Sequence, residues 1–186
     1  MKLYDYTNLL NVINEVNLEN KKLKNLKEMT LKNKYYELEQ KLFNSGILED
    51  WKRLNRLVAD RIFYSKWDNS YLDSIYKNTD KFFEYRDNMF TILVSSGSSW
   101  SDYLCISPEH SLENRKLDWK ITSTTKRWFS GFRNNEEEYK VKILMIETLI
   151  NTYEDYRDYV LKSIVKRINE KIDNNNSLEQ EIISYL

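Results

Sequence analysis

Apolar side chains recur every three or four residues along most of this chain, and this spacing constrains the fold more than any other feature. The longest example begins after two asparagines at 134–135, where the acidic run 136–138 favours the positive end of a helix dipole. It predicts a helix of up to about 35 residues, roughly 50 Å long, that ends at the polar run 173–176. Ser177 and Gln180 then form a capping-box pattern, which predicts a last short helix. The main stripe of the long helix consists of Ile143, Ile146, Ile150, Tyr153, Arg157, Val160, Ile164 and Ile168.

The first 62 residues show the same period. Apolar stripes at 9–16 and 23–42 predict either one long helix with a phase shift or two helices that break near 17–20. Gly46 ends this segment, because glycine tolerates the left-handed conformation at a helix end. Acidic residues at 49–50 then begin a second helix, whose apolar residues are Leu54, Leu57, Val58 and Ile62.

The middle of the chain is less regular. Asn69 and Ser70 predict the cap of a helix whose unbroken three-four register runs from Leu72 to Val94, with Gly97 just beyond it, although 90–94 viewed alone resembles a strand. Residues 97–133 differ, because a serine-rich loop and Pro108 interrupt the helical pattern and Ser111 fits the cap of a turn through 112–117. Strand-like alternation follows at Leu117, Trp119 and Ile121, so this stretch predicts a small β element or an irregular excursion.

These patterns together predict a mainly α-helical fold, an elongated helical bundle with a long C-terminal helix and a small irregular or partly β insertion. We expect one structural domain with an N-terminal helical part (1–96), the insertion (97–133), and the long helix with its short terminal helix (134–186). Three glycines and one proline disfavour a turn-rich sandwich or barrel, and 26 aromatic residues disfavour global disorder. Cys105 is the only cysteine and no apolar run approaches the ~20 residues that span a bilayer, so we expect a soluble cytoplasmic protein.

Residues suited to catalysis or metal binding are scarce. His110 is the only histidine, and neither it nor Cys105 has a soft partner nearby, so a zinc site completed by Glu109 and Glu113 is disfavoured. No glycine-rich phosphate-binding motif occurs. Residues 94–104 loosely resemble the glycine-serine loop of nucleotidyltransferases, but Leu104 stands where a second metal-binding carboxylate would fall. We therefore expect no enzymatic activity, no metal and no cofactor.

The formal net charge is zero, but the charge is unevenly distributed. Residues 20–34 carry a net +5, residues 51–67 carry +4 and residues 115–133 carry +5, whereas residues 134–160 carry −4. The block at 115–133 also interleaves its basic residues with aromatic ones, a mixture that suits protein interfaces and single-stranded nucleic acid alike. A third interpretation has the aromatic side chains fold back onto the helices while the charges stay solvated.

We predict a partner-binding surface in this block and a secondary basic face near the N-terminus. The secondary face has two interpretations, a phosphate-binding track or the solvated side of an amphipathic helix. The partner-binding residues are Arg115, Lys116, Trp119, Lys120, Lys126, Arg127, Trp128, Phe129, Phe132 and Arg133, and the secondary face is Lys21, Lys22, Lys24 and Lys27.

A single alanine beside 20 lysines and 20 asparagines indicates an AT-rich genome, a style common among accessory genes of phages and mobile elements. With the scarcity of site chemistry, it favours a non-enzymatic protein-binding module, an inhibitor or adaptor that acts on a host complex such as a defence nuclease. The alternative is a nucleic-acid-binding accessory protein that uses Lys, Arg and aromatic contacts. The expected partner is a host or cognate protein, or alternatively a nucleic acid or nucleoprotein, and not a membrane.

The long C-terminal helix carries more apolar positions than one partner helix can cover. Either this helix is buried centrally in its own bundle, or its second face meets another chain, for which a two-fold homodimer is the commonest closed arrangement. The positions off the main stripe are Leu144, Leu149, Tyr156, Leu161 and Val165.

Overall fold

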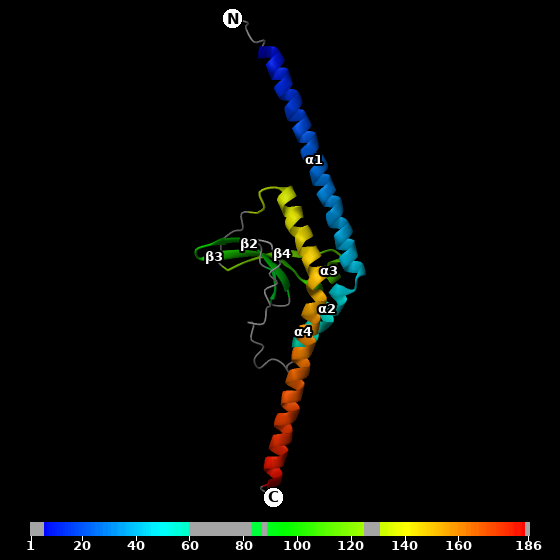
Figure 1. Cartoon of the computed structure of the whole chain (residues 1–186), viewed down its shortest axis with the longest axis vertical. Coiled ribbons are helices and arrows are strands. Elements are labelled where there is room, and N and C mark those ends of the chain that lie inside the picture. The colour runs from blue at the N-terminus through cyan, green and yellow to red at the C-terminus, as the bar shows by residue number, and fades with distance from the viewer. Residues whose placement is uncertain (1–5, 60–82, 87–88, 125–130, 185–186) are drawn as a thin grey trace.

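The computed structural model describes residues 6–59, 83–86, 89–124 and 131–184. Two long helices dominate it, and a four-stranded antiparallel sheet lies to one side of them (Figure 1). The expected mainly α-helical fold, with a long C-terminal helix and a partly β insertion, is confirmed. Along the chain the elements are α1 (Tyr6–Asn44), α2 (Ile47–Ala59), β1 (Phe83–Arg86), β2 (Met89–Gly97), β3 (Trp100–Ile106), α3 (Pro108–Asn114), β4 (Trp119–Ser123) and α4 (Asn135–Ser184).

Helices α1 and α4 pack side by side and run in the same direction. Lys27 pairs with Glu136 at 2.7 Å and Lys34 pairs with Glu147 at 2.9 Å, so the residue numbers rise together along both helices. The pair is staggered, because α4 begins only at the level of Glu28. The N-terminal part of α1 and the C-terminal part of α4 therefore project in opposite directions from a central body (Figure 1).

The core of the body lies where the sheet, α1 and α2 meet α4. From α1, Tyr35 and Leu42 are buried, and Leu31 and Leu38 of the same stripe pack against them. Helix α2 follows Gly46, whose positive φ of 75° closes α1 as expected. The largest fully buried side chains are Trp51, Tyr153, Phe83, Phe90, Leu42, Leu48, Ile92, Leu104, Ile106, Met145, Ile146 and Leu149.

The sheet has the strand order β1-β2-β3-β4, and it presents one apolar face to the helices. Alternate residues such as Phe90 and Ile92 of β2 are buried on that face, as period-two alternation requires. Tyr85 of β1 fixes the sheet to α4, because its hydroxyl lies 3.0 Å from the Thr152 hydroxyl and its ring stacks on Tyr156 at 3.9 Å between centroids.

The predicted helix up to Val94 is wrong for residues 83–86, which form β1, and for residues 89–94, which form most of β2. The sheet therefore begins at Phe83, well before the predicted insertion boundary at 97. Gly97 lies in the β2–β3 hairpin and not beyond a helix end; a Cβ there would collide with the Trp100 ring, so the close approach requires glycine. The predicted cap at Asn69 and Ser70 lies outside the described residues.

Helix α4 is longer than predicted. It continues through the polar run 173–176 to Ser184, and the Ser177 hydroxyl donates to the Asp173 carbonyl at 2.9 Å inside the helix instead of capping a new one. The run contains neither glycine nor proline, and each asparagine costs a helix only about 0.7 kcal/mol relative to alanine. Helix α1 is likewise continuous through 17–20, which decides between the two alternatives for that segment.

Two smaller predictions had different outcomes. The start of α4 is confirmed, because the Asn134 side chain accepts a hydrogen bond from the Glu137 amide at 2.9 Å. Ser111 does not cap the turn, because α3 begins earlier, at Pro108, and the Ser111 hydroxyl donates back to the Ser107 carbonyl. None of the helices in the described part of the chain is long and apolar enough to cross a membrane.

Candidate protein interface

The projecting part of α1, residues 6–26, is named the α1 arm. Four of its apolar residues, Val12, Val16, Leu23 and Leu26, are between 51% and 64% exposed. At 3.6 residues per turn they fall within an arc of about 80° and form one stripe. This stripe is out of phase with Leu31, the first residue of α1 that packs against the core, so it does not continue the α1–α4 seam.

The projecting part of α4, residues 165–184, is named the α4 arm. Leu161, Val165, Ile168 and Ile172 are between 39% and 56% exposed and fall within about 60° of the helix circumference. Ile164 of the same helix points elsewhere, into a small cluster with Leu54 of α2 and Val160. The described part of the chain therefore leaves a second apolar stripe uncovered.

Helix α4 is therefore not covered along its whole length by the described part of its own bundle, although full coverage was one of the two arrangements expected from the sequence. Most of the predicted main stripe is buried as far as Ile164, although Ile150 and Arg157 are only half-buried, and its last member, Ile168, is exposed. Leu149 of the off-stripe set is buried, whereas Leu161 and Val165 are not. The apolar patterns of α1 and α4 indicated the positions of the two exposed stripes, but the sequence alone did not show that the stagger leaves them without a covering helix.

The predicted partner-binding surface is only partly assembled. Lys126, Arg127, Trp128 and Phe129 lie outside the described residues. The two remaining aromatic side chains, Trp119 and Phe132, are half-buried and pack against the core. This packing is what the interpretation that the aromatic side chains fold back onto the helices expects of these two residues.

The described basic residues of this surface lie around these two aromatic side chains in the sequence, and each is exposed or makes a polar contact. Arg115 and Lys116 are exposed just after α3, where Arg115 adopts a left-handed conformation with φ of 51°. Lys120 pairs with Asp118 at 3.4 Å, and the exposed Arg133 donates its backbone N–H to Glu137 before α4 begins.

A cleft of about 560 Å³ lies between α1, α4 and the segment 114–119. Behind it the Trp119 indole donates to the Tyr35 hydroxyl at 2.9 Å, and that hydroxyl donates to the buried Glu39 carboxylate at 2.9 Å. The same carboxylate oxygen accepts the Leu117 amide at 3.1 Å. The Lys142 ammonium lies 5.2 Å from the centre of a Trp119 ring, within cation–π range. Burial is the main cause that raises the pKa of Tyr35 above its usual range.

Sequence reasoning identified Lys116 and Trp119 of this cleft but missed Tyr35, Tyr139 and Lys142. These residues come from α1 and α4, far from the basic block in the chain. Only the high tyrosine content of the sequence hinted at such an aromatic cluster.

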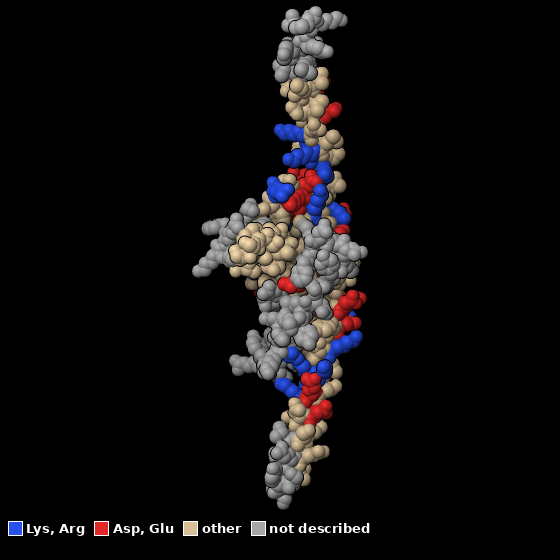
Figure 2. All heavy atoms as spheres, turned by 60° about the vertical axis from the view of Figure 1, so that its left-hand side comes forward, with Lys and Arg blue, Asp and Glu red and all other residues tan. Residues whose placement is uncertain are grey.

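The secondary basic face lies on the α1 arm and at its junction with the body. Lys21, Lys22 and Lys24 are exposed, whereas Lys27 pairs with Glu136. Hydrogen bonds from Lys140 first, and then from Lys27, lower the pKa of the Glu136 carboxyl to about 2. Figure 2 shows the basic side chains of the α1 arm gathered next to the body.

The residues considered for metal or nucleotidyl chemistry do not form a site. Cys105 is buried in β3 with its sulfur 3.4 Å from the Thr122 hydroxyl, whereas His110 lies exposed on α3 beside Glu113. No cluster of metal-ligating side chains occurs within the described ranges. Asp102 is buried and accepts the Ser95 hydroxyl at 2.9 Å, and the neighbouring Gly97–Trp100 segment is a hairpin turn.

Comparisons of this chain with protein-family models, curated proteins and solved structures find no match.

Proposed function

We propose that this chain is a non-enzymatic protein-binding module that engages helical segments of its partner through the two arms. The observation that carries this proposal is the exposed apolar stripe on each arm. Helices in water owe most of their stability to the packing of an apolar face. Contiguous exposed apolar surface marks protein–protein contact.

The spacing within the stripes suits pairing with another helix. Leu161, Val165, Ile168 and Ile172 follow one another at intervals of four, three and four, the heptad spacing of a coiled-coil seam. The two arms carry such stripes at opposite ends of one body, so the chain can contact two partner segments that lie far apart. An adaptor needs this property. The charges of Arg115, Lys116 and Lys120 support a secondary contact beside the body.

An inhibitor or adaptor acting on a host complex, such as a defence nuclease, is the more specific form of this proposal. It rests on the composition and on the arms together. A nucleic-acid-binding accessory protein is the alternative, and the exposed Lys21, Lys22 and Lys24 favour it. The pairing of Lys27 with Glu136 and of Lys120 with Asp118 disfavours it, because neutralised lysines release fewer counterions from phosphate.

Capture from a lysate of an AT-rich bacterium tests the proposal. Immobilised wild type is compared with Leu23→Asp on the α1 stripe and Ile172→Asp on the α4 stripe. Asn17→Asp and Asn174→Asp are the matched controls, since each adds the same charge to the same arm away from its stripe. We expect the two stripe variants to lose specific proteins that the controls retain.

Two outcomes contradict the proposal. Equal capture by stripe variants and controls removes the arms from the interface. Loss of capture after nuclease treatment, with an affinity that falls steeply as salt rises, establishes the nucleic-acid alternative.

A further inference from the structure

We infer that the two arms fit each other, so that the α4 arm of one copy binds the α1 arm of a second copy and the chain assembles head to tail. This inference rests on the proposed function, because it names the partner of the same two stripes. Four independent features of the arms carry it: their direction, length, register and charge.

The direction follows from the parallel packing of α1 and α4. When copies stack along their long axis, the α4 arm of the upper copy descends beside the α1 arm of the lower copy, and the two run parallel (Figure 1). Each copy then repeats between molecules the parallel pairing that α1 and α4 form within one molecule.

The lengths also match. The α1 arm ends where α4 begins beside Glu28, and the α4 arm begins after Ile164, the last residue of α4 in the described core. The arms are thus 6–26 and 165–184, or about 31 Å and 30 Å at 1.5 Å per residue. When two copies stack, the α4 arm of one copy therefore fits along the full length of the α1 arm of the other copy.

The two stripes share one register. If Ile168 is level with Val12, then Ile172 is level with Val16, and both pairs are apolar and exposed in the single copy. The next position of each stripe is polar, and in this register Asn175 is level with Glu19.

A shift of one heptad either way removes this agreement. It sets Ile168 against Glu19 in one direction and Glu179 against Val16 in the other. The first register has one mismatched layer, Glu179 level with Leu23, whereas the shifts give two or more, because Asn175 then also lies against Leu26 in one direction and against Val12 in the other. The first register alone places the polar positions Asn175 and Glu19 opposite one another, which is how polar residues specify register in coiled coils.

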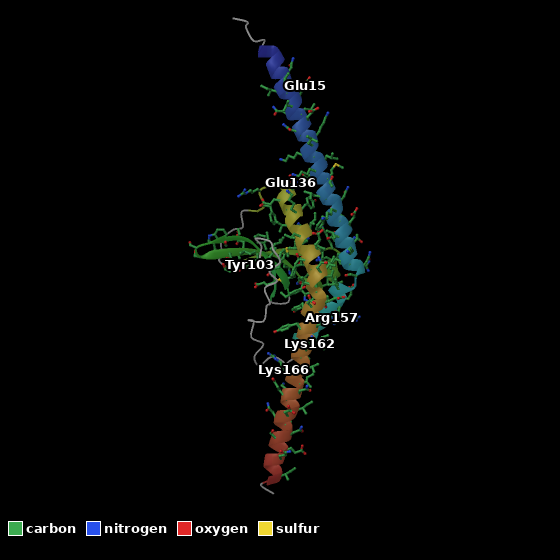
Figure 3. The ribbon with its side chains drawn as sticks, viewed as in Figure 1. Glu15, Tyr103, Glu136, Arg157, Lys162 and Lys166 are labelled. Carbon is green, nitrogen blue, oxygen red and sulfur yellow. The ribbon has the colours of Figure 1, made fainter. Side chains whose placement is uncertain are left out.

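The charges of the two arms are complementary in this orientation. Each arm is acidic toward its tip and basic next to the body, as Glu15 on the α1 arm and Lys162 and Lys166 near the base of the α4 arm illustrate (Figure 3). Residues 6–20 carry −2 and 21–26 carry +3, whereas 161–172 carry +3 and 173–184 carry −3. Parallel stacking of the two arms sets each acidic tip beside the basic base of the other arm (Figure 2).

A two-fold dimer through α4 alone fits these features less well. Antiparallel pairing of two α4 arms also joins opposite charges when each tip is level with the other base, but it then sets Ile168 level with Glu181 and Ile172 level with Ser177. It also leaves the α1 stripe uncovered. The head-to-tail contact covers both stripes with one interface, and such a heterologous contact builds open chains or rings.

Sedimentation velocity over a hundredfold concentration series tests the inference with the full chain. We expect the mean mass of the wild type to rise from 22.6 kDa through successive multiples. Val16→Asp and Ile168→Asp each stay at one chain, because each disables one half of the contact. An equimolar mixture of the two variants retains one intact contact and therefore doubles in mass and stops there. Asn17→Asp and Asn174→Asp assemble like the wild type.

Three results overturn the inference: a wild type that stays at one chain throughout, an Ile168→Asp variant that still dimerises through α1, or a Val16→Asp variant that still dimerises through α4. The lysate capture separates this result from the proposed function. Stripe-dependent capture of other proteins by a strictly monomeric chain refutes self-assembly and keeps the adaptor. Self-assembly without capture of any other protein supports the head-to-tail assembly and refutes the adaptor.

Discussion

At the scale of single residues, Glu39 joins α1 to the segment 117–119, which is distant from it in sequence. Its carboxylate accepts the Tyr35 hydroxyl from within α1 and the Leu117 amide from the segment before β4, and Tyr35 in turn accepts the Trp119 indole. Glu39, Tyr35 and Leu117 are buried, so the Tyr35 hydroxyl and the Leu117 amide depend on this one carboxylate as their acceptor.

Replacing Glu39 with alanine should therefore lower the free energy of unfolding by about 1–3 kcal/mol, the cost of leaving buried donors without an acceptor. Glu39→Gln keeps a side-chain oxygen at the same place and should cost less. Urea denaturation of the two variants beside the wild type measures the difference. Equal stability of the alanine variant and the wild type would show that the network does not hold segment 117–119 in place.

The alkaline pH dependence of stability follows from the buried tyrosines. Burial raises the pKa of Tyr156 to about 12, whereas a phenol in an unfolded chain titrates near 10. Between these values the unfolded chain has released a proton that the folded chain keeps, so stability present below pH 10 is lost as the pH rises toward 12. Between pH 10 and pH 12, one such group lowers the free energy of unfolding by about 1.4 kcal/mol for each pH unit.

Tyr156→Phe removes one titrating group from this set. We expect its unfolding free energy to fall less steeply than that of the wild type between pH 10 and pH 12. Urea denaturation at half-unit pH intervals measures both slopes, and identical slopes would show that Tyr156 titrates alike in the folded and unfolded chain.

At the scale of elements, the sequence predicted the helices better than the strands. The starts of α2 and α4 carry acidic first turns, and Gly46 ends α1 with a positive φ. Such local signals act within one turn, so they can be read without the rest of the fold.

Strands β1 and β2 were missed because their apolar residues satisfy two periods at once. Phe83 and Phe90 lie seven residues apart, which is two helical turns, and both are buried in the sheet. The choice between the periods depends on the pairing of β2 with β3, in which Thr91 lies opposite Cys105, beyond the reach of a helical turn. Tertiary pairing of this kind overrides local propensity.

The α4 arm makes few contacts with the body, so its helix should respond locally to substitution. Asn174→Pro removes a backbone hydrogen bond and should unfold the helix around and beyond that position, while the melting temperature of the body stays unchanged. Asn174→Ala should instead stabilise the arm by about 0.7 kcal/mol. Hydrogen exchange of residues 165–184 distinguishes the two effects, and a matching loss of protection in β2 would contradict an independent arm.

At the scale of the whole molecule, the stagger predicts a long particle. Helix α4 alone spans about 75 Å, and the α1 arm adds about 30 Å. A compact chain of 186 residues would have a radius of gyration of about 16 Å. Small-angle scattering of a Val16→Asp, Ile168→Asp double variant should give a clearly larger radius and a maximum dimension on the order of 100 Å. A radius near the compact value would mean that the arms fold back.

The candidate interface was predictable only in part, because the exposure of its residues depends on how the two long helices align. The apolar positions of both stripes and the lysines next to them were evident in the sequence. Their exposure was not, because it depends on where α4 begins relative to α1, and that alignment is fixed by pairs such as Glu28 with Asn135. The cleft beside Trp119 needed the same alignment to bring Tyr35 and Lys142 together.

The parallel packing of α1 with α4 has a consequence for biosynthesis. The ribosome makes α1 first and α4 last, and the bonded pair Glu28 and Asn135 is separated by 107 positions. At about 5–20 residues per second, the core-facing side of α1 waits on the order of 5–20 s for its partner. During that interval Leu31, Leu38 and Leu42 are open to any helix with the same spacing, including α1 of a neighbouring nascent chain on the same message.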